Sequence, residues 1–114
     1  MQDLYAERKA IIDELVEECE TMRNSGCQLA HNESEYRKAV RVETLKERME
    51  GTPVTVISDL VRGIPYVAEL RDALKCSEAI YKSSQEKINV LKLRLRIVEE
   101  DISRDWHSGG AYGG

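Results

Sequence analysis

The residue pair with the most recognisable chemical spacing is Cys27 and His31, which stand four positions apart. In a helix this spacing places a thiolate and an imidazole on one face, where both can bind zinc. A structural zinc site needs four ligands, and the remaining candidates, Cys19, Cys76 and His107, follow no recognised ligand spacing. We therefore favour a buried structural cysteine beside a surface histidine, and we predict no metal site and no cofactor.

Ser77 and Ser84 are the hydroxyls that most resemble catalytic nucleophiles, because they flank Tyr81 in an otherwise apolar row. No histidine lies near either serine in the sequence, and neither serine occupies the sharp turn that presents the nucleophile of hydrolases. We interpret both as small side chains that leave room for bulky ones on a facing helix, such as Tyr36 or Val40. The sequence therefore predicts no catalytic residue, and we expect a protein that is not an enzyme.

A basic cluster is the feature that could bind nucleic acid. It consists of Lys82, Lys87, Lys92, Arg94 and Arg96. Lysine and arginine neutralise phosphates, so one reading is a stripe that follows a DNA backbone. No aromatic stacking platform or glycine-rich loop accompanies these charges, and the whole chain has a net charge of −4. We favour a solvated face that pairs with the acidic residues at 13–20, and keep direct DNA binding as the second hypothesis.

These residues are positioned by a long helix predicted between Pro65 and Trp106, a segment without internal proline or glycine. Its apolar and small residues alternate at three and four positions, which keeps one row facing a partner helix. The row contains Val67, Leu70, Leu74, Ser77, Tyr81, Ser84, Ile88, Leu91, Leu95, Val98 and Ile102. We expect the members Val67, Leu74, Tyr81, Ile88 and Leu95 to pack against that partner.

Residues 2–50 lack proline and are predicted to form the partner helix. Two seven-residue rows run along it. One row contains Ile12, Cys19, Gly26, Glu33 and Val40, and the other contains Leu15, Met22, Leu29 and Tyr36. Asn24, Ser25 and Gly26 have poor helix propensity, so we expect a continuous helix with a thin or bent middle.

The connection between the two long helices is predicted to contain a short helix at 53–62. Gly51 suits the left-handed position after a helix, and Thr52 followed by Pro53 suits an N-cap with proline at the first helical position. A strand at 54–57 is the alternative, but no second strand exists to pair with it. Because the connection is short, the long helices must fold back on each other.

The predicted fold class is therefore all-α: a long antiparallel, coiled-coil-like helical hairpin with a short connecting helix. We expect a single domain at 1–108, in which the last helix occupies 65–106. Residues 109–114 are rich in glycine and are predicted to form a flexible tail.

A two-helix hairpin buries one row per helix, and this chain has apolar residues beyond those rows. Ile80, Val90, Leu93 and Ile97 lie beside the row of the last helix, and Trp106 follows its end. Such a surplus predicts an oligomer or partner interface, and we expect a homodimer or higher oligomer that completes a helical bundle. Trp106 is either an anchor for a partner or a cap over the end of the bundle.

The cellular compartment follows from cysteine usage and hydropathy. Three scattered cysteines without a CxxC pair indicate a reducing compartment. The first residues are charged and lack the apolar core of a secretory signal, and no run approaches the ~20 apolar residues that span a bilayer. We expect a cytoplasmic protein without a membrane partner.

Three parts of the chain carry a family resemblance: Glu50–Gly63, Tyr81–Asn89 and the pair Asp105-Trp106. They resemble a family of small uncharacterised helical proteins encoded in the early region of phages and prophages of Gram-positive bacteria, over residues 36–106. Genes of that family tend to lie beside recombination and single-strand-binding genes. The resemblance implies a role in phage DNA metabolism or host takeover, inside the bacterial host cell, and brings no catalytic residue.

The sequence-based hypothesis is thus a non-catalytic phage accessory protein that acts by protein–protein interaction. An oligomer that sequesters a nucleotide signal between its subunits is a third possibility. A further resemblance is to small secreted helical hairpins with a Trp-x-Gly motif at the turn. The chain departs from them, because its turn has no tryptophan and Trp106 begins Trp-x-x-Gly at the far end.

Overall fold

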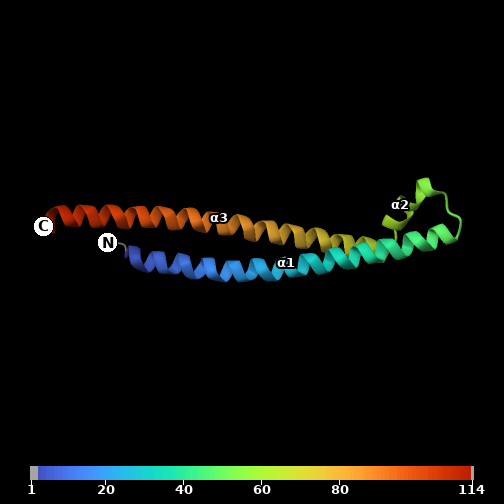
Figure 1. The fold of residues 1–114 in the computed structure, drawn as a ribbon, viewed down its shortest axis with the longest axis horizontal. Helices are drawn as coiled ribbons and strands as arrows, with labels where there is room; N and C mark the ends of the chain where they lie inside the picture. The colour runs from blue at the N-terminus through green and yellow to red at the C-terminus, as the bar shows by residue number, and fades with distance from the viewer. Residues whose placement is uncertain (1–2, 114) are drawn as a thin grey trace. The chain divides into compact units, whose positions relative to one another are not determined.

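The computed structural model describes residues 3–113, and describes side chains for residues 3–108. It contains three helices in the order α1 (Leu4–Met49), α2 (Val54–Arg62) and α3 (Pro65–Gly113). Helices α1 and α3 run antiparallel, and α2 lies in the connection between them (Figure 1). No strand occurs in residues 3–113. The predicted all-α hairpin with a short connecting helix is confirmed.

Helix α1 begins at a side-chain cap and continues without interruption through its weakest segment. The Asp3 carboxylate accepts hydrogen bonds of 3.1 Å from the backbone N–H groups of Tyr5 and Ala6, which α1 itself leaves unpaired. At Gly26 an added Cβ would lie 3.3 Å from Cε2 of Tyr81. The helix is therefore continuous, as predicted. At Gly26, where the side chain is smallest, the Tyr81 ring approaches the backbone of α1 closely.

The end of α1 is a left-handed glycine motif. Gly51 has a φ of +79°, its N–H donates to the carbonyl of Arg48, and the N–H of Thr52 donates to the carbonyl of Glu47. The predicted N-cap role of Thr52 is wrong. Pro53 occupies that position in α2, while the Thr52 hydroxyl donates to the Glu47 carboxylate at 2.6 Å.

Contacts divide the chain into two compact units, where we expected one domain at 1–108. We call Met1–Arg23 with Ser83–Gly114 the terminal unit, and Asn24–Lys82 the turn unit. In an antiparallel helix pair each turn touches only the turn beside it, so contacts stay local. Each unit is described separately below.

The terminal unit has a narrow core between α1 and α3. Ile11, Leu91 and Val98 are buried, and Leu15, Leu95 and Ile102 pack against them half-buried. The predicted row through Ile12 and Cys19 is wrong in this unit, because both residues are exposed while Ile11 and Glu18 are buried. A shift by one residue rotates a helix face by about 100°, so a narrow seam that buries Ile11 leaves Ile12 outside it.

The turn unit has a core formed by all three helices. Ile57 and Val61 of α2 are buried against Ala39 of α1 and Val67 of α3. The expected inner row of α3 is confirmed: Val67, Leu74 and Ile88 are buried across the two units, and Tyr81 and Leu95 are half-buried. The short helix thus covers apolar surface that two helices alone would leave in water.

Helix α3 continues to Gly113, beyond the end predicted at Trp106. Its backbone therefore includes most of the segment 109–114 that was expected to form a flexible tail, and Gly114 lies outside the described residues. Glycine costs a helix about 1 kcal/mol per residue but still donates and accepts the helical hydrogen bond. None of the helices formed by the described residues has the length and apolarity needed to span a bilayer.

Candidate functional site

Ser84 belongs to a charged network in the terminal unit. Glu18 is only 9% exposed, and its carboxylate forms an ion pair with Nζ of Lys87 at 3.2 Å. The Ser84 hydroxyl and then Lys87 stabilise the charged form, so they lower the pKa of Glu18 although burial opposes this. Ser84 therefore stabilises a carboxylate in the interface between α1 and α3.

Ser77 occupies the equivalent position in the turn unit, with a neutral partner. Asn32 donates from Nδ2 to the Ser77 hydroxyl at 2.5 Å, and that hydroxyl donates to the carbonyl of Ala73 at 3.0 Å. We expected bulky side chains such as Tyr36 or Val40 opposite these serines, and both of those residues pack half-buried against the core around Ala39 and Val67. Polar side chains of α1 face both serines, a pattern that apolar periodicity does not detect.

The five residues of the predicted nucleic-acid face have different environments. Lys87 binds Glu18, and Arg94 lies 3.8 Å from Glu14, as the predicted pairing with the acidic residues required. The other three, Lys82, Lys92 and Arg96, are exposed and form no ion pair within the described residues. Two of the five charges are therefore already balanced by carboxylates.

The predicted interface residues are all exposed. In the terminal unit Val90, Leu93 and Ile97 are 56%, 54% and 49% exposed, and their spacing of three and four places them on one face of α3. Trp106 in that unit is also exposed, as is Ile80 in the turn unit. About half of each aliphatic side chain is thus available to another molecule.

The possible metal ligands are not brought together. Cys27 and His31 are both exposed, so the expectation of a buried structural cysteine at Cys27 is wrong. Cys19 and Cys76 are exposed as well. Within the described residues, no group of three or more histidine, cysteine or carboxylate side chains could hold a metal ion.

A groove with a volume of about 420 Å³ lies between α1 and α2 in the turn unit. Its lining has apolar members from both helices: Tyr36, Val40, Val54, Ile57 and Val61. Thr44 and Ser58 add hydroxyl groups. Volume and apolar content both lie in the range of binding sites, although the groove is open along one side.

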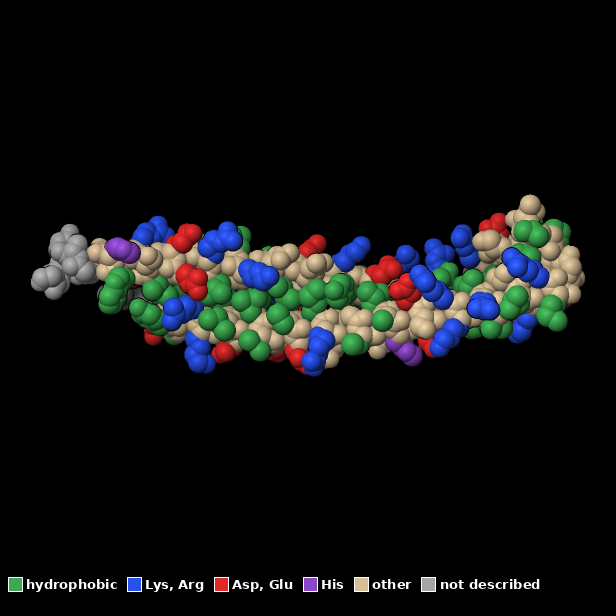
Figure 2. Space-filling view, viewed as in Figure 1, with side chains coloured by type: hydrophobic (Ala, Val, Ile, Leu, Met, Phe, Trp, Pro, Cys, Tyr) green, Lys and Arg blue, Asp and Glu red, His purple; other side chains and the backbone are tan. Residues whose placement is uncertain are grey.

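The same groove is lined by four arginines and by no acidic residue, and we call it the arginine groove. Arg37, Arg41 and Arg48 come from α1, and Arg62 comes from α2. Arg37 pairs with Glu33 at 2.8 Å, while the other three are exposed and form no ion pair within residues 3–108. Figure 2 shows Lys and Arg side chains gathered at the α2 end of the molecule.

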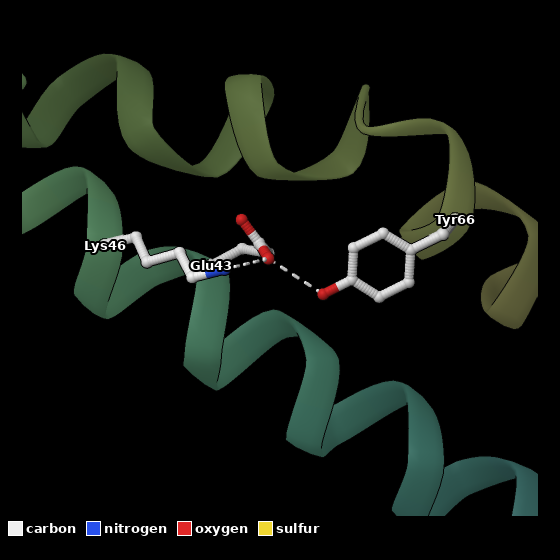
Figure 3. Close-up of polar contacts among 3 residues, drawn as sticks. All are labelled: Glu43, Lys46 and Tyr66. Carbon is white, nitrogen blue, oxygen red and sulfur yellow. Dashed lines mark hydrogen bonds and ion pairs between the residues drawn. The ribbon is translucent and has the colours of Figure 1, made fainter.

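Carboxylates near the arginine groove are held by other partners. Glu43 accepts hydrogen bonds from the Tyr66 hydroxyl at 2.9 Å and from Lys46 at 3.2 Å (Figure 3). These contacts lower the pKa of Glu43, with Tyr66 as the larger cause, and raise the pKa of Tyr66. Glu47 likewise accepts a hydrogen bond from the Thr52 hydroxyl. Within the described residues, neither acid forms an ion pair with an arginine of the groove.

Sequence reasoning missed the arginine groove. Arg37, Arg41 and Arg48 share one side of a helix by their spacing of four and seven, so part of the signal is present in the sequence. The sequence carries no signal that places α2 against that side of α1. Comparisons with family models, with curated proteins and with solved structures found no match to this chain.

Proposed function

We propose that this protein is a non-catalytic accessory protein of a phage or prophage, which acts by protein–protein interaction in the cytoplasm of the bacterial host. The resemblance in sequence suggests a setting in DNA replication, recombination or host takeover. The observation that carries the interaction role is the half-exposed row of Val90, Leu93 and Ile97 on α3. A row of this kind is the usual contact surface of helices that associate.

Burial of this row contributes part of the energy that association requires. Complete burial of one such aliphatic side chain contributes ~1.5–3 kcal/mol, so covering three half-exposed ones contributes roughly 2–4 kcal/mol before the costs of association. A second copy that covers the row with its own would complete a helical bundle. The same surface is open to a helix of another phage or host protein.

Light scattering at micromolar concentration tests the proposal. We expect the wild-type mass to be a multiple of the 13.0 kDa chain mass, and the triple change V90S/L93S/I97S to reduce it. The matched control K92S/R96S/E99S changes three exposed neighbours on the same helix and should keep the wild-type mass. A wild-type protein that stays monomeric would contradict the oligomer.

Direct DNA binding by the Lys82 to Arg96 face is less well supported, because Lys87 and Arg94 are engaged by carboxylates. It predicts a salt-sensitive shift of a labelled oligonucleotide that is lost in K82E/K92E/R96E. Absence of a shift at low salt would eliminate this alternative.

A further inference from the structure

The arginine groove contains positive charge that the described residues do not balance. Arg41, Arg48 and Arg62 are exposed and form no ion pair within the described residues, and no acidic residue lines the groove. Several cations around an apolar surface attract a molecule with complementary negative charge. The groove therefore has the chemistry of a binding site for an acidic, partly apolar ligand.

The arrangement of the arginines selects an extended ligand. Arg37 and Arg48 are eleven residues apart on α1, which corresponds to ~16 Å along the helix axis. A single phosphate group is too small to contact both. The lining also favours protein over single-stranded nucleic acid, because its only aromatic side chain, Tyr36, is half-buried and cannot act as a row of stacking platforms.

The terminal unit presents a surface with this complementary chemistry. Its acidic segment contains Asp13, Glu14, Glu17, Glu18 and Glu20, without a basic residue. Glu14 and Glu18 pair with α3. Asp13, Glu17 and Glu20 are exposed, although Asp13 and Glu20 also form ion pairs within α1, with Lys9 and Arg23. Ile12 and Val16, which are 41% and 68% exposed, lie among them at helical spacing. We call Ile12, Asp13, Val16, Glu17 and Glu20 the acidic face.

We infer that the arginine groove of one copy binds the acidic face of a second copy. The inference rests on the proposed self-association and assigns residues to one of its contacts. The acidic face and the α1 side of the groove lie on one uninterrupted helix, which does not bring two of its own segments together, so the occupant comes from another molecule. The acidic face is already helical, so binding does not require a segment to fold.

Charge reversal on each side tests the contact. R41E/R48E makes the groove acidic, and D13R/E17R makes the acidic face basic. Each variant alone should weaken self-association at least about tenfold, because like charges then meet, and the wild-type contact should weaken with salt. The matched controls K92E/R96E and E69R/D72R change the net charge equally at exposed positions outside both surfaces.

Mixing the two reversed variants provides the decisive measurement. The native acidic face of R41E/R48E fits the native groove of D13R/E17R, and the two reversed surfaces also attract each other. We expect sedimentation velocity to show association in the mixture but in neither variant alone, with helical content unchanged by circular dichroism. A mixture that stays dissociated overturns the inference.

The outcomes separate this inference from the proposed function. If the wild type associates, V90S/L93S/I97S dissociates it and R41E/R48E does not, the interaction role stands and the groove contact is wrong. A monomeric wild type overturns both the oligomer and the groove contact. If R41E/R48E instead abolishes binding of a labelled oligonucleotide while self-association is unchanged, the groove binds nucleic acid and the inference fails.

Discussion

The terminal unit and the turn unit use the same two helices but differ in how much apolar surface they bury. In the terminal unit α1 and α3 pack alone, the core is a single seam around Ile11, Leu91 and Val98, and the adjoining row on α3 remains exposed. In the turn unit α2 adds Ile57 and Val61 to the core. A third helix therefore covers the flank of a hairpin, and its edge also creates the arginine groove.

The two units also differ in the polar residues of their seams. Glu18 with Ser84 and Lys87 gives the terminal unit a charged network, whereas Asn32 with Ser77 gives the turn unit a neutral one. Buried polar groups must be paired, so each network requires one relative position of the facing helices. Of these two networks, only the charged one makes stability depend on pH.

The largest effect on stability is expected from a substitution in the narrow core of the terminal unit. Ile11→Ala should lower the free energy of unfolding by about 2–5 kcal/mol, because Ile11 is 1% exposed and its loss leaves a cavity. Ile12→Ala is the matched control at the neighbouring, partly exposed position and should cost much less. Thermal denaturation of both variants measures the difference. Equal destabilisation by the two variants would contradict the observation that α1 buries Ile11 and exposes Ile12.

The next effect concerns the close approach in the turn unit. Gly26→Val should cost about 1–3 kcal/mol, because a Cβ already lies 3.3 Å from the Tyr81 ring and further methyl groups overfill the seam. In a Tyr81→Ala background the same change should be tolerated or stabilising, since the ring is absent. A double-mutant cycle by urea denaturation checks this. Additive effects would show that the two residues do not interact.

The charged network of the terminal unit should make stability sensitive to acid. The pKa of Glu18 is lowered in the folded state, so its contribution is present above the ordinary glutamate pKa and is lost as pH falls through the folded value. Glu18→Gln should reduce that loss, measured as unfolding free energy against pH. Asn32→Ala removes the neutral pair of the turn unit and should cost about 1 kcal/mol without altering the acid dependence.

The smallest expected effect is at the first turn of α3. Tyr66→Phe removes the larger cause of the lowered pKa of Glu43, so that pKa should rise toward its ordinary value while Lys46 keeps part of the shift. Carbon-detected NMR titration of the Glu43 carboxyl group measures the change. The pKa of Tyr66 is raised in the folded state, so its hydrogen bond stabilises the fold below the ordinary tyrosine pKa and loses this effect at higher pH. Tyr66→Phe removes that contribution to stability. An unchanged Glu43 titration would contradict the hydrogen bond.

Much of the fold was predictable because helix signals are local. The uninterrupted alternation in α3, the left-handed position of Gly51 and proline at the start of α3 depend on neighbours in the chain. The inner row of α3 was correct for the same reason. The α1 row was partly wrong because Ile12 has the same apolar character as Ile11, and because Glu18 is not recognisable as a seam residue without Ser84 and Lys87 opposite it.

The sequence by itself determined the helices, the reversal at Gly51 and the surplus of apolar side chains on α3, since periodicity and turn chemistry act over a few residues. Only the tertiary structure decided which carboxylates are neutralised, which serines bond to α1, and where α2 packs. These depend on distances between segments far apart in the chain, which no local pattern contains. The arginine groove exists because α2 lies against Tyr36 and Val40, beside arginines whose spacing alone does not define a site.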